Sequence, residues 1–137
     1  MQKKLVSWIG GNDLKAIAGE SSGPILSTLK TAEFDSAHLL YSYPQTEVEP
    51  YLSWLQQQVD IPIKATEAKL SSPVSFGEIY LCVEPLLKEL STTETELSIL
   101  LSPGTPAMQA VWILLGKTRY PAVFYQSSRE SGVERVE

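Results

Sequence analysis

Two short turn sequences contain residue types and spacings that suit the binding of a small anion. In the later one, Ser102-Pro103-Gly104-Thr105-Pro106, an apolar segment ends and a helix-forming segment begins. Gly104 can adopt the positive φ of a sharp turn, the Thr105 hydroxyl can cap a helix, and Pro106 suits the first helical position because it has no backbone N–H. A helix that starts where a strand ends presents free N–H groups and the positive end of its dipole. The later turn is therefore predicted to hold a phosphate group or a nucleotide.

The sequence offers little for catalysis. A serine nucleophile needs a neighbouring base, and the only histidine, His38, opens a predicted strand without a partner motif. Paired carboxylates are missing from the turns, where Asp13 stands alone. The single cysteine, Cys82, excludes an internal disulfide and a cysteine-based metal cluster, so it is assigned to the core. We predict no catalytic residue, no metal and no cofactor.

Strand-like and helix-like segments alternate along the chain. Apolar runs predict strands, and apolar residues at helical spacing predict helices, the last of which should end at Gly116. Pro85 lies inside the third helix and is expected to kink or split it. The predicted strands are residues 4–9, 37–43, 61–65, 98–101 and 120–126, and the predicted helices are 24–31, 46–59, 76–90 and 106–115.

These βα repeats predict an α/β fold, a Rossmann-like three-layer sandwich around a mostly parallel sheet of five to six strands in the order 3-2-1-4-5. Short, wholly apolar strands agree with a sheet that is covered on both faces. Ligands of such folds bind beyond the carboxyl ends of the strands where the strand order reverses, here between the first and fourth strands. The turn Gly10-Gly11-Asn12-Asp13 and the turn Ser102-Pro103-Gly104-Thr105 are therefore expected to face one crevice.

Length and composition predict one domain, residues 1–126, followed by a polar segment, residues 127–137. No apolar run approaches the roughly 20 residues that span a bilayer. The apolar stretch before Gly10 is too short for the apolar region of a signal peptide. We therefore expect a cytoplasmic protein without a membrane contact. The net charge of −5 argues against wrapping of long nucleic acids, although a short nucleotide can still bind.

The segments VSWIGGNDL and LLSPGTPAMQAVWILL resemble the early and late motifs of the CARF domain, the CRISPR-associated Rossmann fold. In that family a late strand continues into a Gly-Thr turn and a helix that carries a Met. The resemblance implies a CARF-like fold and a sensor of cyclic oligoadenylate or another short RNA-derived nucleotide. The residues that it implies as ligand contacts are Gly10, Gly11, Asn12, Asp13, Ser102, Gly104, Thr105, Met108 and Gln109.

Within that family, SPGTPAMQ is most similar to the amino-terminal sensor domains of sigma-54-dependent transcriptional regulators. This similarity implies that residues 127–137 are a linker toward a missing C-terminal effector, an AAA+ activator, and that DNA is contacted only through that missing part. Two alternatives remain open. The chain can be a ring nuclease that cleaves cyclic oligoadenylate by positioning a ribose hydroxyl for in-line attack, or a dimerisation module that binds no ligand.

The helical segment of residues 107–115, which begins at Ala107 and ends at Leu115, is apolar on nearly all sides. Packing on one face of a sheet requires apolar residues on one side of a helix only. The excess indicates a second buried surface, and CARF domains usually form dimers around a two-fold axis. A homodimer through this helix is therefore predicted.

Overall fold

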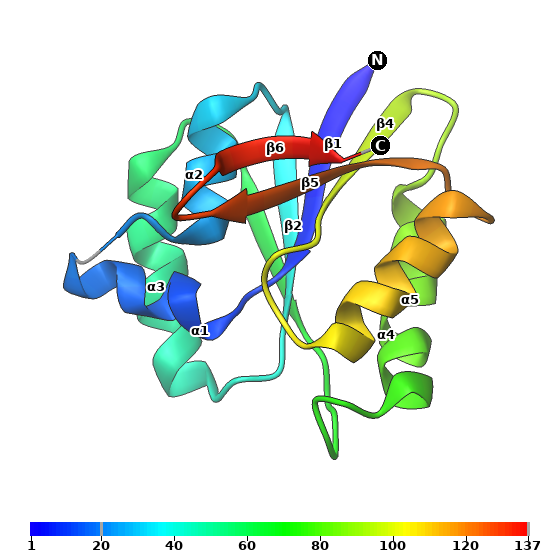
Figure 1. The fold of residues 1–137 in the computed structure, drawn as a ribbon, viewed down its shortest axis with the longest axis horizontal. Coiled ribbons are helices and arrows are strands. Elements are labelled where there is room, and N and C mark those ends of the chain that lie inside the picture. Colours follow the sequence, from blue (N-terminus) through cyan, green and yellow to red (C-terminus); the bar gives the residue numbers. More distant parts are fainter. Residues whose placement is uncertain (20, 137) are drawn as a thin grey trace.

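The chain folds around one six-stranded sheet. A computed structural model describes residues 1–19 and 21–136, and within them the strand order is β3-β2-β1-β4-β5-β6 (Figure 1). Strands β1 to β5 are parallel, and β6 is antiparallel to β5. The predicted Rossmann-like sandwich and the order 3-2-1-4-5 are confirmed, with one strand added. The strands are β1 Gln2–Trp8, β2 Ser36–Tyr41, β3 Ile63–Glu67, β4 Thr95–Leu100, β5 Ala122–Ser128 and β6 Gly132–Val136.

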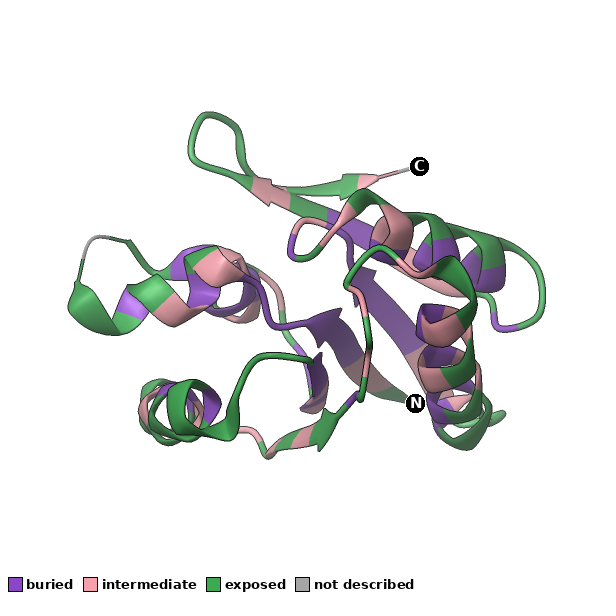
Figure 2. Cartoon of the chain, turned by 90° about the horizontal axis from the view of Figure 1, so that it is seen from below, coloured by how far each residue is buried: buried purple, intermediate pink, exposed green. Residues whose placement is uncertain are grey.

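Helices cover both faces of the sheet. One face carries α1 (Gly11–Leu14), a 3-10 turn at Lys15–Ala18, α2 (Gly23–Thr31) and α3 (Gln45–Gln58). The other face carries α4 (Phe76–Leu90) and α5 (Pro106–Lys117). Figure 2 shows that buried residues occupy the sheet and the helix surfaces turned toward it. None of the helices in the described part of the chain is long and apolar enough to cross a membrane.

Neighbouring residues of the central strands supply the two cores. Along β1, Leu5 belongs to the core under α2 and α3, while Val6 and Trp8 belong to the core under α4 and α5. The Trp8 ring lies against the Trp112 ring of α5, with centroids 6.5 Å apart. Because both faces of the sheet are buried, its strands are continuous apolar runs rather than alternating ones.

Two expectations about the helices differ from the structure. Gly116 does not end the last helix, because α5 continues to Lys117. A Cβ at Gly116 would lie 2.6 Å from Cζ of Phe124, so this glycine is required for the close packing of α5 on β5. Pro85 does not split α4, which runs as one helix from Phe76 to Leu90.

The segment predicted as a linker, residues 127–137, is part of the sheet as far as Val136, and Glu137 lies outside the described residues. Ser127 and Ser128 complete β5, and β6 pairs back onto it. Val133 and Val136 lie on opposite faces of β6 and pack against the two different cores. Two apolar residues in a polar segment anchor this strand, which explains why composition alone indicated a linker.

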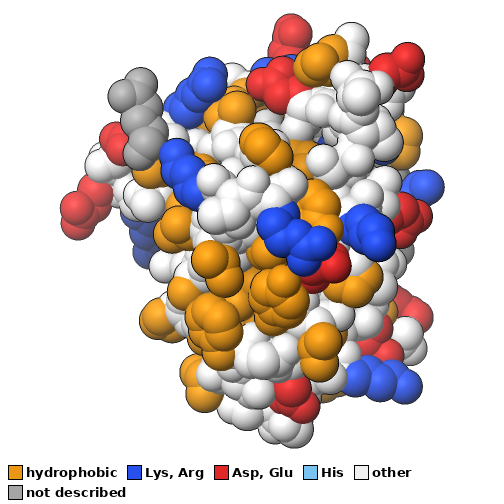
Figure 3. Space-filling model, turned by 90° about the vertical axis from the view of Figure 1, so that its right-hand side faces the viewer, with side chains coloured by type: hydrophobic (Ala, Val, Ile, Leu, Met, Phe, Trp, Pro, Cys, Tyr) orange, Lys and Arg blue, Asp and Glu red, His pale blue; other side chains and the backbone are white. Residues whose placement is uncertain are grey.

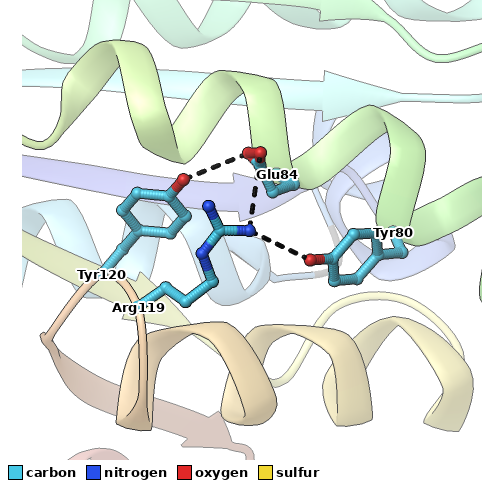
Figure 4. Close-up of polar contacts among 4 residues, drawn as sticks. All are labelled: Tyr80, Glu84, Arg119 and Tyr120. Carbon is cyan, nitrogen blue, oxygen red and sulfur yellow. Dashed lines mark hydrogen bonds and ion pairs between the residues drawn. The ribbon is translucent and has the colours of Figure 1, made fainter.

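A polar cluster joins α4 to the connection between α5 and β5 (Figure 4). The Tyr120 hydroxyl donates a hydrogen bond to Oε2 of Glu84 (3.1 Å), and Nη1 of Arg119 lies 3.8 Å from Oε1 of the same carboxylate. The Arg119 guanidinium also reaches the Tyr80 hydroxyl at 3.4 Å. Since Arg119 is mostly exposed, we expect its ion pair to contribute little to stability and the partly buried Tyr120 bond to contribute more.

Candidate functional site

A pocket of about 420 Å³ lies at the carboxyl ends of the strands, where the loops after β1 and β4 meet. A Cβ added to Gly10 would be 3.2 Å from Cβ of Pro103 and 3.3 Å from the backbone nitrogen of Gly104, so the two loops are in contact. The strand order predicts this meeting, and the structure shows it. We call this cavity the central pocket. Its lining residues are Ile9, Gly10, Gly11, Ser42, Tyr43, Pro44, Leu70, Pro73, Gly104, Thr105 and Met108.

The residues expected to contact a ligand do not all reach the central pocket. Gly10, Gly11, Gly104, Thr105 and Met108 line it. The other four, Asn12, Asp13, Ser102 and Gln109, lie elsewhere.

Ser102 and Gln109 line a smaller neighbouring pocket of about 290 Å³ beside β5 and β6. The Ser102 Oγ accepts a hydrogen bond from the backbone N–H of Ser127, so its side chain ties the loop after β4 to the end of β5. Asn12 lines a third pocket of about 490 Å³, together with residues of the α2 amino terminus and the β5–β6 turn.

Asp13 is fully buried, so its side chain does not reach the solvent side of any pocket. Its Oδ2 accepts the backbone N–H of Gly10 and its Oδ1 accepts the backbone N–H of Ile25, both at 2.9 Å. Burial raises the pKa of this carboxyl from 3.8 to about 6, although the two hydrogen bonds act in the opposite direction. In this structure Asp13 holds the backbone in place rather than facing a ligand.

Thr105 caps α5, as the sequence predicts. Its hydroxyl oxygen accepts the N–H of Met108 at 3.3 Å, and the hydroxyl also donates to the carbonyl of Pro73 at 2.7 Å. The second bond ties the β3–α4 loop, residues 68–75, to the rim of the central pocket. Since Pro106 has no N–H and the N–H of Met108 is already bonded, the first turn of α5 offers fewer free donors to an anion than expected.

Gly104 adopts a φ of +99°, which confirms the expected positive φ. A Cβ at this position would lie 2.7 Å from Sδ of Met108. A glycine is therefore needed for the turn and also for the approach of the Met108 side chain to the pocket wall. The same sulfur accepts the N–H of Thr105 at 3.4 Å, which fixes it beside the turn.

Six residues of the central pocket were not among the expected ligand contacts. One of them, Ile9, directly precedes Gly10, and the remaining five come from two other segments. Ser42, Tyr43 and Pro44 follow β2, and Leu70 and Pro73 belong to the β3–α4 loop. The signal for the first three is their position at the end of the strand next to β1. No local motif marks the other two, because the path of a long loop is decided by tertiary contacts.

The lining of the central pocket carries no charged side chain. It consists of glycines, prolines, aliphatic residues and a methionine, together with the hydroxyl groups of Ser42, Tyr43 and Thr105. Tyr43 is 37% exposed, and a Cβ on Gly11 would lie 3.4 Å from its hydroxyl oxygen. Such a lining suits a flat, uncharged ring with polar edges better than a bare phosphate.

The fold defines the chain as a Rossmann-like α/β domain with its pocket at the reversal of strand order. No family model matches the sequence, and no curated protein matches it by sequence comparison.

Solved structures share the fold. Csm6 from Enterococcus italicus, bound to cyclic hexa-2'-fluoro-hexa-dAMP, matches with a TM-score of 0.81 at 16% identity, over 98% of this chain and 35% of that one. Can2 from Sulfobacillus thermosulfidooxidans, in complex with cyclic tetra-adenylate, matches with a TM-score of 0.67 at 13% identity, over 98% of this chain and 37% of Can2. A type III CRISPR defence DNA nuclease activated by cyclic oligoadenylate matches with a TM-score of 0.61 at 17% identity, over 92% of this chain and 18% of the nuclease. The chain thus spans about a third or less of these proteins.

Proposed function

We propose that this chain is a CARF sensor domain that binds a cyclic oligoadenylate or a related short RNA-derived nucleotide in the central pocket. The observation that carries this proposal is the position of the pocket, between the loops after β1 and β4, in a fold shared with proteins solved with cyclic oligoadenylates. The motif around Gly104, Thr105 and Met108 supports it, because these residues form the pocket wall.

The uncharged lining assigns a nucleobase, rather than a phosphate, to the pocket. An adenine can lie against the Tyr43 ring and the Met108 thioether, and its ring nitrogens can bond to the Ser42 hydroxyl or to loop backbone groups. The phosphates then remain at the open side of the pocket. Binding should therefore depend on the base and should be only weakly competed by inorganic phosphate.

Calorimetric titration with cyclic tri-, tetra- and hexa-adenylate and with a 2′,3′-cyclic-phosphate RNA end tests this function. We expect at least one of these compounds to bind with a Kd of about 1 μM or tighter and to raise the melting temperature. A cyclic oligouridylate is the control for the base. The absence of heat and of a thermal shift with every nucleotide would leave only the dimerisation module. Chromatography of the titrated mixture detects ring opening, which would establish the ring-nuclease alternative.

We also propose that the domain controls an attached sigma-54-dependent AAA+ activator. The support is the similarity of the segment from Ser102 to Gln109 to the sensor domains of such regulators. In a longer chain that carries the activator, addition of the bound nucleotide should change the rate of ATP hydrolysis, and contact with DNA should require that added part.

The outer surface of α4 and α5 supports the predicted homodimer. Ile113 and Leu114 of α5 are 44% and 47% exposed, and Leu81 of α4 is 72% exposed. Figure 3 shows hydrophobic side chains gathered on this face. Trp112, by contrast, is fully buried against the sheet. The apolar residues beyond those needed for packing on the sheet therefore point away from it, and a second copy of the chain would cover them.

The Leu114→Glu variant is expected to be a monomer, because a charge on this apolar surface must be buried when two copies meet. Analytical ultracentrifugation should give twice the chain mass of 15.1 kDa for the wild type and the single mass for the variant. Gln57→Glu, an added charge on the exposed side of α3, is the matched control and should remain a dimer. A wild type that is monomeric at every concentration would contradict the proposed dimer.

A further inference from the structure

A single carboxylate connects the central pocket to the amino terminus of α2. Asp13 is fully buried, and its two oxygens are each bonded to a backbone N–H at 2.9 Å. One N–H belongs to Gly10, which lines the pocket and contacts the loop after β4. The other belongs to Ile25 in the first turn of α2. The carboxylate thus fixes the position of the pocket loop relative to a helix that is packed on the sheet.

The surroundings of Asp13 leave little room for rearrangement. A Cβ on Gly23, whose φ is +78°, would lie 3.0 Å from Cα of Asp13 and 3.1 Å from its Oδ1. From α3, the buried Tyr51 hydroxyl lies near enough for the charge of Asp13 to act on it, and this hydroxyl has no hydrogen-bond partner among residues 1–19 and 21–136. Both burial and the Asp13 charge raise the pKa of Tyr51, so the phenol remains neutral. Two elements donate N–H groups to the carboxylate: the loop after β1 through Gly10, and helix α2 through Ile25.

We propose that Asp13 is a positioning residue for the central pocket, holding Gly10 and Gly11 where a nucleotide contacts them. The proposal rests on the proposed function, since it concerns the same pocket. Both carboxylate oxygens are needed, because two N–H donors approach from different elements. An uncharged carboxyl or amide has only one carbonyl acceptor, so either change weakens one of the two bonds.

Protonation of Asp13 supplies a readout that a purely structural role would not give. Its pKa of about 6 lies above its ordinary value, so the contribution of Asp13 to stability increases as the pH falls from 7.5 to 5. The hold on Gly10 weakens over the same interval. A positioning residue therefore makes nucleotide affinity fall while the folded state gains stability. A general loss of structure would make both fall together.

The test is the affinity of wild type and Asp13→Asn for cyclic tetra-adenylate and cyclic hexa-adenylate between pH 5 and pH 7.5. At pH 7.5 the variant should bind about threefold to tenfold more weakly, the effect of one lost backbone hydrogen bond. As the pH falls, the affinity of the wild type should approach that of the variant. The pH profile of the variant's affinity corrects for titration of the ligand. Equal affinities at pH 7.5 would overturn the proposal.

Asp35→Asn is the matched control, because Asp35 also accepts a backbone N–H, that of Lys3 at 2.7 Å, outside the central pocket. The nucleotide affinity of Asp35→Asn should equal that of the wild type. NMR hydrogen exchange of the Gly10 amide gives a ligand-free measurement: exchange should be faster in Asp13→Asn and unchanged in Asp35→Asn. If no nucleotide binds the wild type, the proposed function fails, while unchanged Gly10 exchange in Asp13→Asn would reject the positioning role by itself.

Discussion

The Gly11→Leu variant is expected to lose nucleotide binding while remaining folded. Gly11 lines the central pocket at the start of α1, and a Cβ there meets only the Tyr43 hydroxyl, at an ordinary contact distance of 3.4 Å. A side chain can therefore start at Gly11 without a backbone clash, and a leucine there is expected to occupy space that the proposed base needs. We expect the affinity for cyclic oligoadenylate to fall by about 100-fold or more, measured by calorimetric titration.

Gly77→Leu provides the matched control for this substitution. Gly77 lies in the first turn of α4, and a Cβ there has no heavy atom within 4 Å. It does not line the central pocket. The nucleotide affinity of Gly77→Leu should remain within about twofold of the wild type, a smaller change than the loss of one hydrogen bond causes. Undiminished binding by Gly11→Leu would place the nucleotide outside the central pocket.

The second large effect is the pH dependence of stability caused by Asp13. The pKa of this carboxyl is raised from 3.8 to about 6 in the folded state by burial. The folded state therefore holds the proton more tightly than the unfolded chain, and the stabilisation is complete below pH 3.8 and is lost as the pH rises through 6. Relative to Asp13→Asn, the wild-type free energy of unfolding should fall by about 3 kcal/mol between those limits.

Urea denaturation of both proteins at pH 4, 5, 6 and 7.5 measures this difference. The variant serves as the reference because all other titrating groups are shared and cancel. A constant difference across the range would show that the Asp13 carboxyl has an ordinary pKa and is hydrated. A difference that grows in the opposite direction would mean that the two N–H bonds outweigh burial.

Much of the architecture could be predicted because it depends on local patterns. Apolar runs marked the five parallel strands, and the rule for strand order at a topological switch brought the loops after β1 and β4 together. Thr105 was identified as a helix cap because the residues that follow it, Pro106 onward, are typical of a first helical turn. The strands and the cap are each encoded within a few residues of where they occur, and the meeting of the two loops follows from a general rule for parallel sheets.

The remaining features depend on contacts between distant residues. Asp13 looked like a ligand contact in a polar turn, and only the fold shows that it bonds the N–H of Ile25, twelve positions away. Gly116 resembled a helix end, although its role is to admit the Phe124 ring. Ser102 and Gln109 belong to the same motif as Thr105. They line a different cavity, however, because they lie on the side of the loop where β5 and β6 are.

The two hydrogen bonds of the Thr105 hydroxyl have different consequences when the β3–α4 loop moves. Movement of the loop at Pro73 breaks the bond to the Pro73 carbonyl, whereas the bond from the N–H of Met108 can persist and keep the start of α5 capped. The net cost of that one bond is about 0.5–1.5 kcal/mol. Displacement of the loop at Pro73 therefore leaves the first turn of α5 capped, so it does not require this helix to fray.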